Sequence, residues 1–293
     1  MKCFSVCFCC DKNYYIHLIV SIKSLLENNK DLIFKIYVIN EDFHKNEIAS
    51  LKALIESYKN IFVYINDLNW DYSKLKTTRQ FSKAIYYRIS IPYLICDDLV
   101  LYLDSDIIVN GSLIDLFSIN LKDKVLGAVQ DIGYIDYKSL DMDYEHGYFN
   151  SGVMLINTKE WKSNNVTQKV LSLLENKKIN FLYPDQDALN MVLVKKWKNI
   201  KPTYNQQASF FYKKLKKRGL CIFGEEFNDS RKRPLIIHYS GSKKPWHTSS
   251  THPYRKKYWF YRSKIDFIHN YFDDFSFKNY LKYLIKKVLR IKL

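Results

Sequence analysis

The chain has 293 residues, of which 47% are hydrophobic and 26% are charged. This length is sufficient to bury a substantial core, and we expect one large domain with a small appendage. No run of about 18 apolar residues occurs, which argues against a membrane-spanning helix. Lys and Arg outnumber Asp and Glu by 46 to 30, a net charge of +16, so the candidate partners are nucleic acid, an anionic membrane surface or an acidic substrate.

Apolar runs alternate with amphipathic stretches from the first residues onward. The pattern predicts strands over residues 3–9, 33–39 and 61–65, separated by helices over 14–27 and 45–57. A β-α-β-α-β order of this kind predicts a parallel sheet with right-handed crossovers.

Cysteines are crowded into the first predicted strand, at Cys3, Cys7, Cys9 and Cys10. A zinc site is one interpretation, but no His or Cys pair is spaced to complete it. We therefore interpret these cysteines as small buried hydrophobic residues. Reduced thiols of this kind indicate the cytosol.

A predicted helix over 81–94 leads to an apolar strand over 99–103, which ends at Asp104 and Asp106. The unbroken apolar run is typical of a strand buried on both faces of a parallel sheet, and such sheets bind ligands just beyond the carboxyl ends of their strands. Residues i and i+2 of an extended segment face the same side, so both carboxylates can reach one cation. The alternative is that the acids cap a helix or shape a turn.

The alternation continues in the second half of the chain, with strands predicted over 125–130, 149–157 and 235–239 and helices over 159–174 and 185–196. The last of these strands carries His238, which is either a metal ligand or a hydrogen-bonded structural residue. Neither of the glycine-rich phosphate-binding motifs, G-x-G-x-x-G and G-x-x-x-x-G-K-[ST], occurs. Any bound phosphate must therefore be neutralised in another way, for which a cation is the obvious means.

The basic surplus is concentrated at the carboxyl-terminal end, where residues 254–293 contain 11 Lys or Arg and 3 Asp, or 8 of the 16 net charges. Apolar residues recur there with helical spacing at positions 277, 280, 281, 284, 285 and 288, while Lys278, Lys282, Lys286 and Arg290 occupy other faces. A basic amphipathic helix is typical of a segment lying in a membrane interface. The alternative is that the apolar stripe packs on the protein's own core.

A second basic stretch, residues 213–218, reads KKLKKR. We interpret it as a solvated loop or helix end, with contact to an anionic acceptor as the alternative.

Six stretches, in order, resemble the family 8 glycosyltransferases, the retaining enzymes that include bacterial lipooligosaccharide galactosyltransferases, lipopolysaccharide core glucosyl- and galactosyltransferases, and glycogenin. They are CCDKNY at 9–14, YYRISIP at 86–92, LYLDSDIIV at 101–109, FNSGVMLIN at 149–157, PDQDALN at 184–190 and HYSGSKKPWH at 238–247. The resemblance covers roughly residues 1–250. It implies an α/β fold, a GT-A type nucleotide-binding sandwich with a mostly parallel central sheet. The helical spacing near the carboxyl-terminal end adds a small basic C-terminal helical extension to this expectation.

With this resemblance, we expect a catalytic domain over 1–252 and a basic, aromatic-rich membrane-association segment over 253–293. The expected metal ligands are Asp104, Asp106 and His238. An imidazole ligand favours Mn²⁺, with Mg²⁺ as the alternative. The expected donor is UDP-glucose or UDP-galactose, and the expected acceptor is a growing glycan or glycolipid, such as lipopolysaccharide or lipooligosaccharide.

The resemblance also implies roles for individual residues. Those expected to bind the donor are Asp11, Asn13, Arg88, Ser105, Asn150, Gly241 and Lys244. Those expected at the reacting centre are Gln186, Asp131 and Asp185, whereas Asp187 is expected to orient its helix. Asp11 and Asn13 can also cap the helix over 14–27. Lys244 and Lys243 are alternatively ordinary surface charges, and Arg88 is alternatively part of a surface ion pair.

Retention of anomeric configuration usually indicates a carboxylate nucleophile. The resemblance instead places the amide of Gln186, a poor nucleophile, nearest the anomeric carbon. We therefore expect front-face attack by the acceptor, with the departing phosphate oxygen taking the acceptor's proton.

Two other functions fit parts of the sequence. A nucleotidyltransferase also uses paired aspartates and a cation, but it leaves His238 and the PDQDALN stretch without a role. A basic nucleic-acid-binding protein would suit the net charge, but no recognition motif occurs, and we expect no nucleic-acid partner. The sequence thus favours a cytoplasmic hexosyltransferase that associates peripherally with the inner face of the cytoplasmic membrane through its tail.

Overall fold

The computed structural model describes residues 3–77, 82–176, 178–269 and 271–288. Its centre is a seven-stranded sheet in the order β3-β2-β1-β4-β7-β6-β8, of which β7 alone runs against the other strands. The strands are β1 Cys3–Cys9, β2 Ile33–Ile39, β3 Ile61–Ile65, β4 Leu99–Leu103, β6 Leu126–Gln130, β7 Phe149–Asn157 and β8 Trp197–Asn199. The prediction of an α/β fold with a mostly parallel central sheet is confirmed.

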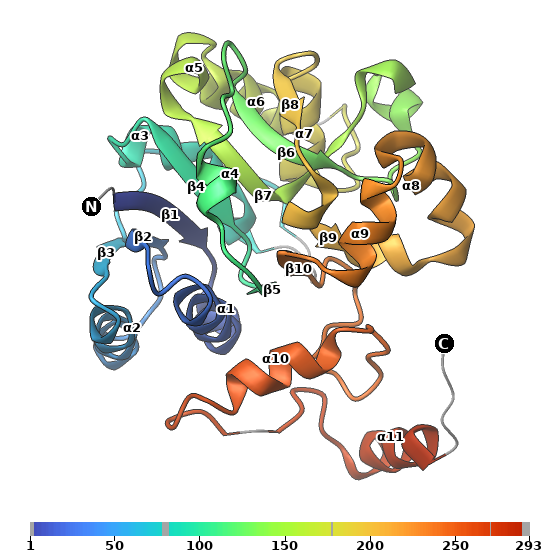
Figure 1. Cartoon of the computed structure of the whole chain (residues 1–293). Helices are drawn as coiled ribbons and strands as arrows, with labels where there is room; N and C mark the ends of the chain where they lie inside the picture. Colours follow the sequence, from blue (N-terminus) through green and yellow to red (C-terminus); the bar gives the residue numbers. More distant parts are fainter. Residues whose placement is uncertain (1–2, 78–81, 177, 270, 289–293) are drawn as a thin grey trace.

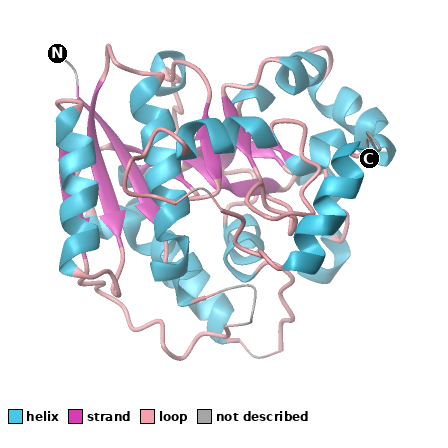
Figure 2. Ribbon diagram, turned by 90° about the horizontal axis from the view of Figure 1, so that it is seen from below, coloured by secondary structure: helices cyan, strands magenta, loops and turns pink. Residues whose placement is uncertain are grey.

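Helices cover both faces of this sheet (Figures 1 and 2). Side chains of α1 Tyr15–Glu27 and α2 Lys45–Ser57 pack on one face, and side chains of α3 Ile91–Leu94, α5 Thr158–Ser163, α6 Val166–Glu175 and α7 Pro184–Val192 pack on the other. Alternate residues of each strand are divided between the two cores. In β1, for example, Val6 and Phe8 face the first core, and Cys7 and Cys9 face the second. The sheet is thus buried on both sides, as its apolar strands require.

A second, three-stranded sheet begins directly after Asp106, beyond the carboxyl end of β4. It contains β5 Ile107–Val109, β9 Gln206–Gln207 and β10 Ile236–His238, in the order β5-β10-β9. The pairing of β5 with β10 sets His238 opposite Ile107, next to Asp106. This small sheet therefore brings two segments that are far apart in the sequence to the carboxyl end of β4.

Several predicted elements differ from those observed. The helix predicted over 81–94 is a 3-10 helix over Lys83–Ser90 followed by the short α3, which has Pro92 in its first turn; Phe81 lies outside the described residues. The helix predicted over 159–174 is split into α5 and α6, because Asn165 adopts a left-handed backbone conformation with φ of 52°. The helix predicted over 185–196 ends at Val192.

The cysteines are all free thiols. Cys7, Cys9 and Cys10 are buried, as predicted, but Cys3 is exposed because it is the first residue of its strand, at the edge of the core.

The remaining helices are α4 Ile114–Phe117, α8 Lys216–Phe223, α9 Glu226–Lys232, α10 Arg255–Arg262 and α11 Phe277–Val288. The basic stretch 213–218 forms a 3-10 turn and the start of α8, and its lysines are exposed. Arg218 differs, since it is only partly exposed and lies over the ring of Tyr144.

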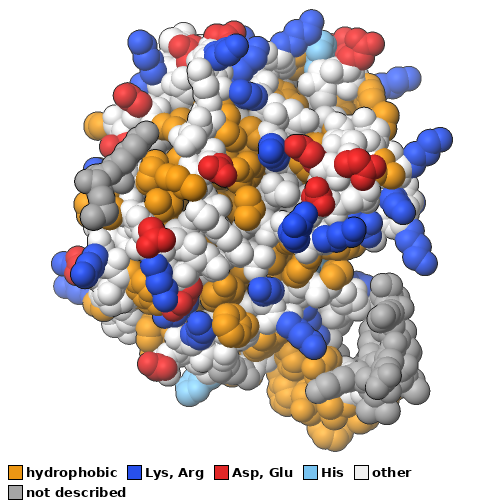
Figure 3. Space-filling model, in the orientation of Figure 1, with side chains coloured by type: hydrophobic (Ala, Val, Ile, Leu, Met, Phe, Trp, Pro, Cys, Tyr) orange, Lys and Arg blue, Asp and Glu red, His pale blue; other side chains and the backbone are white. Residues whose placement is uncertain are grey.

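The carboxyl-terminal residues beyond 252 include both a buried part and an exposed part. Tyr258 and Tyr261 of α10 belong to the main core, and the Arg262 side chain is fully buried. Beyond α10 the chain projects to α11 (Figure 1), where hydrophobic atoms form a visible patch (Figure 3). Among the described residues, no helix combines the length and the hydrophobicity needed to span a bilayer.

Candidate active site

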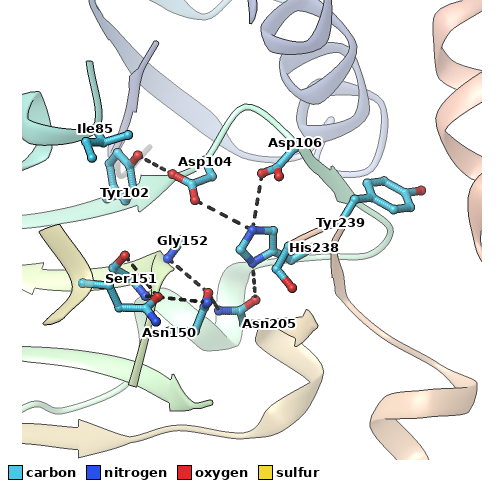
Figure 4. A network of polar contacts seen from close by, with 12 residues as sticks. Ile85, Tyr102, Asp104, Asp106, Asn150, Ser151, Gly152, Asn205, His238 and Tyr239 are labelled. Atoms are coloured by element: carbon cyan, nitrogen blue, oxygen red, sulfur yellow. Dashed lines mark hydrogen bonds and ion pairs between the residues drawn. The ribbon is translucent and has the colours of Figure 1, made fainter. Parts of the chain in front are cut away.

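Asp104, Asp106 and His238 converge at the carboxyl end of β4. Each offers one ligand atom, and these atoms all lie within 4.8 Å of one another. His238 Nε2 is 3.3 Å from Asp106 Oδ1 and 3.7 Å from Asp104 Oδ2 (Figure 4). Backbone hydrogen bonds fix both acids, because Asp104 N donates to Gly152 O and Asp106 O accepts from Tyr239 N. Two carboxylates and an imidazole nitrogen around one point are a donor set that suits Mn²⁺ or a similar divalent ion.

Gly152 lies directly against the His238 and Asp104 side chains. A Cβ on Gly152 would lie 2.3 Å from His238 Cε1 and 2.6 Å from Asp104 Oδ2. Only a residue without a side chain therefore allows both ligands to approach as closely as they do.

Basic side chains balance the acids. Lys244 Nζ donates to Asp106 Oδ2 over 2.5 Å and to Tyr239 O over 2.8 Å. Burial raises the pKa of Asp106, but the nearby Lys244 and His238 outweigh burial and hold that pKa well below its usual range. Lys244 is therefore a partner of the candidate metal site rather than an ordinary surface charge.

Arg88 holds the other acid. Its guanidinium donates to Asp104 Oδ1 at 2.9 Å, lies 3.2 Å from Asp185 Oδ2, and donates to the Ser151 backbone and hydroxyl oxygens. Its side chain is 7% exposed and lies over the Tyr102 ring. Burial raises the pKa of Asp185 to about 6, although the Arg88 charge opposes this rise. Arg88 is thus a buried bridge between two acids, not a surface ion pair.

These residues line a cavity of about 1090 Å³, which is large enough for a nucleotide sugar together with part of an acceptor. Every residue that the sequence analysis assigned to the site lies on its wall: Asp11, Asn13, Arg88, Asp104, Ser105, Asp106, Asp131, Asn150, Asp185, Gln186, His238, Gly241 and Lys244. Asp11 accepts a hydrogen bond from Asn13 N and so caps the turn before α1.

Amide side chains connect the cluster to the far wall. Asn150 Nδ2 lies 3.1 Å from Gln186 Oε1 and 3.5 Å from Asp131 Oδ2. Burial raises the pKa of Asp131 above its ordinary value. Asp187 instead accepts hydrogen bonds from Leu182 N, Tyr183 N and the Tyr148 hydroxyl, so it orients the start of α7, in agreement with the prediction.

Several residues of the cavity were not predicted from the sequence. Tyr14 and Trp246 lie on its wall, although both stand inside stretches that the resemblance used. Asn205, which contacts His238 but does not line the cavity itself, gave no signal in the sequence. Asp273 and Asp274 also reach the cavity, where Asp273 pairs with His17 and Asp274 accepts from Thr248. The chain as far as Asp274 therefore borders the cavity, beyond residue 252, where the catalytic domain was expected to end.

The chain is similar to known proteins in sequence and in fold. The model of glycosyl transferase family 8 matches residues 5–250. General stress protein A of Bacillus subtilis is 34% identical over 87% of this chain and 91% of its own length, and the lipopolysaccharide 1,2-glucosyltransferase of Escherichia coli is 31% identical over 83% of this chain and 73% of its own. The crystal structure of the galactosyltransferase LgtC with donor and acceptor sugar analogs superposes with a TM-score of 0.76, at 25% identity over 91% of this chain and 98% of that one.

The chain belongs to glycosyltransferase family 8, and it is an enzyme of the glycosyl-transfer class. The family assignment favours glycosyl transfer over the nucleotidyltransferase interpretation of the sequence.

Proposed function

We propose that the protein is a retaining, metal-dependent hexosyltransferase that moves glucose or galactose from a UDP-sugar to a growing surface glycan. The observation that carries this proposal is the convergence of Asp104, Asp106 and His238 on the wall of one large cavity. The relatives named as lipopolysaccharide glucosyl- and galactosyltransferases support the sugar and the acceptor class.

The cavity has an end suited to a nucleotide. Asp11 and Asn13 offer polar atoms there, and the partly buried Tyr14 offers an aromatic face on which a base can stack. Lys244 contacts Asp106 and lies near Tyr14, so its charge can meet a diphosphate that joins the nucleotide to the sugar. Gly241 leaves room there, with nothing closer than 3.5 Å to the position of an added Cβ.

Asp104, Asp106 and His238 would hold the cation, which we propose to be Mn²⁺. When bound, it supplies Lewis-acid stabilisation of the negative charge that develops on the leaving diphosphate. Arg88 orients Asp104 through its ion pair, and the Lys244 charge orients Asp106 and lowers its pKa.

The reacting centre lies toward Asn150, Asp185 and Gln186. These side chains present amide and carboxyl groups that can hold hexose hydroxyls, and Asp131 stands where donor and acceptor would meet. We propose front-face substitution: the bond from the anomeric carbon to the phosphate oxygen breaks, the acceptor oxygen bonds to that carbon, and the acceptor's proton passes to the departing phosphate oxygen. Gln186 positions the sugar and forms no covalent intermediate.

The test is the release of UDP from a panel of UDP-sugars, followed by NMR determination of the anomeric configuration of the product. We expect UDP-glucose or UDP-galactose to be the preferred donor and the product to retain the donor's configuration. Asp104→Asn should abolish turnover, whereas Asp123→Asn, which changes an exposed acid outside the cavity, should not. Inversion of configuration, or full activity of Asp104→Asn, would refute the proposal.

We also propose that the tail, residues 253–293, places the enzyme on the anionic inner surface of the cytoplasmic membrane. Several large hydrophobic side chains of the tail are exposed, namely Phe267, Tyr271, Phe275, Phe277, Leu281 and Ile285. Tyr283 instead packs on Phe272, so one side of α11 faces the protein and the other faces outward. Of the proposed membrane-association segment 253–293, residues 289–293, with Arg290, lie outside the described residues, as do the side chains of Lys282 and Lys286.

A further inference from the structure

Asn205 lies behind His238, on the side of the imidazole away from the two acids (Figure 4). It directly precedes β9, which pairs in parallel with β10, so adjacent strands bring the two side chains together. Asn205 is fully buried, and its Oδ1 is 2.9 Å from His238 Nδ1. A buried amide in this place must satisfy both of its polar ends.

Backbone N–H groups fix the orientation of the neighbouring amides. Ser151 N donates to Gln186 Oε1 over 2.9 Å, so that atom is the acceptor of its amide. The Asn150 atom 3.1 Å from it must then be the NH₂ group. Asn150 Oδ1 therefore points the other way, and it accepts from Gly152 N over 3.2 Å, which fixes the same orientation independently.

The orientation of Asn205 follows from that of Asn150. The Asn205 atom 2.9 Å from Asn150 Oδ1 must be Nδ2, because two acceptors would repel each other. Asn205 Oδ1 thus faces His238 Nδ1, and only a protonated Nδ1 can donate to it. In the neutral imidazole the lone pair is then on Nε2, which faces the carboxylates of Asp104 and Asp106.

We propose that Asn205 is a positioning residue, which holds His238 in the tautomer whose Nε2 is free to bind a divalent cation. This inference rests on the metal role assigned under the proposed function. A hydrogen bond behind a metal-ligating histidine fixes the tautomer and the direction of the ring, and its loss typically costs about 10–100-fold in metal affinity. Through Asn150, the same amides connect the cation site to Gln186 at the sugar end of the cavity.

The test is the affinity of the full chain for Mn²⁺, measured by electron paramagnetic resonance of the free ion without any sugar nucleotide. We expect Asn205→Ala to weaken binding about 10–100-fold. Asn205→Asp keeps an acceptor toward Nδ1 while losing the donor to Asn150, so it should recover most of the affinity. A residue needed only for packing would give two variants with equal Mn²⁺ affinity and different melting temperatures.

Asn110→Ala is the matched control. Asn110 Nδ2 donates to Pro234 O over 2.9 Å at the other end of the β5–β10 pair, so its loss should lower the melting temperature and leave Mn²⁺ affinity unchanged. In the metal-free wild type, at a pH high enough that the imidazole carries one proton, the nitrogen-15 spectrum of His238, assigned by its loss in His238→Gln, should show that proton on Nδ1. This measurement decides the matter even if Asn205→Ala does not fold.

Several outcomes would overturn the inference. Wild-type Mn²⁺ affinity in Asn205→Ala, Asn205→Asp as weak as Asn205→Ala, or a neutral imidazole with its proton on Nε2 would each contradict the role of Asn205. If the wild type bound no Mn²⁺, the proposed metal role would be wrong and the role of Asn205 with it. If the wild type bound Mn²⁺ and Asn205→Ala bound it equally, only the role of Asn205 would be wrong.

Discussion

Lys244 Nζ lies 2.5 Å from Asp106 Oδ2, although 138 positions separate the two residues in the sequence. Both side chains are largely buried, with 16% of the Lys244 surface and 9% of the Asp106 surface exposed. Water therefore has little access to the Asp106 carboxylate, and Lys244 balances its charge. Burial lowers the pKa of Lys244, but Asp106 outweighs it and raises that pKa. Asp106 is also a candidate metal ligand, so the lysine and a cation compete for the same carboxylate.

This competition predicts opposite effects of Lys244→Met on two ligands. Mn²⁺ should bind the free enzyme more tightly, because Asp106 loses its fixed positive partner. UDP should bind about 10–100-fold more weakly, because a charge-assisted hydrogen bond is worth about 1.5–3 kcal/mol. Calorimetric titrations of each ligand measure both effects. Lys243→Met, at an exposed neighbouring position, is the control, and a weaker Mn²⁺ affinity in Lys244→Met would refute the competition.

Gly152→Ala should remove metal binding through sterics alone. The added Cβ would stand 2.3 Å from His238 Cε1, so the imidazole or β7 must move. Gly219→Ala is a matched control, since its Cβ would meet the Phe227 ring at 2.4 Å outside the cavity. We expect both variants to melt at lower temperatures but only Gly152→Ala to lose Mn²⁺ binding. Equal Mn²⁺ binding by the two folded variants would contradict the role of Gly152.

The raised pKa of Asp185 predicts a defined pH dependence of the free energy of unfolding. Its pKa is about 6 in the folded protein against 3.8 for the ordinary group, so the folded state holds its proton more tightly than the unfolded state does. The wild type should therefore lose stability relative to Asp185→Asn as pH rises from about 4 to about 6, by about 3 kcal/mol in total, and the difference should be constant above that range. Urea unfolding of both proteins at several pH values measures this. A difference that is independent of pH, or that grows in favour of the wild type, would show that the pKa is not raised.

The outward side of α11 is predicted to bind anionic membranes. Replacing Phe277, Leu281 and Ile285 together with Ser should lower co-sedimentation with phosphatidylglycerol vesicles and leave turnover of a water-soluble acceptor unchanged. The control is the double variant Ile61→Ser and Ile114→Ser, which removes exposed apolar side chains elsewhere. Unchanged co-sedimentation of the triple variant would rule out this role.

Sequence periodicity located the central strands well, because each is a compact apolar run. The bounds of β1, β2, β3 and β4 agree with the predicted ones. Periodicity did not predict β5, β8 and β9. The strand β5 directly follows two acids, and β8 and β9 are only three and two residues long, too short to show a pattern. Asn165 and Pro92 interrupt helical patterns that otherwise appear continuous.

The site was predictable as far as its residues followed strands or lay in the six stretches. Asp104, Asp106 and His238 were placed at strand ends by the apolar runs before them, and the structure brings them together. Asn205 and Asp273 were not predictable, because they reach the site through long-range packing. Asp273, for instance, is held by His17 and by the buried Arg262. Such contacts leave no periodicity in the sequence.

The central claim is that Asp104, Asp106 and His238 together bind a divalent cation on which transfer from a UDP-sugar depends. The most direct measurement is the rate of UDP release by the wild type, Asp104→Asn and His238→Ala, first with a chelator and then with excess Mn²⁺. We predict that the chelator stops the wild type, that Mn²⁺ restores it, and that neither variant responds. Undiminished UDP release with the metal chelated, or a variant that Mn²⁺ activates as fully as the wild type, would contradict the claim.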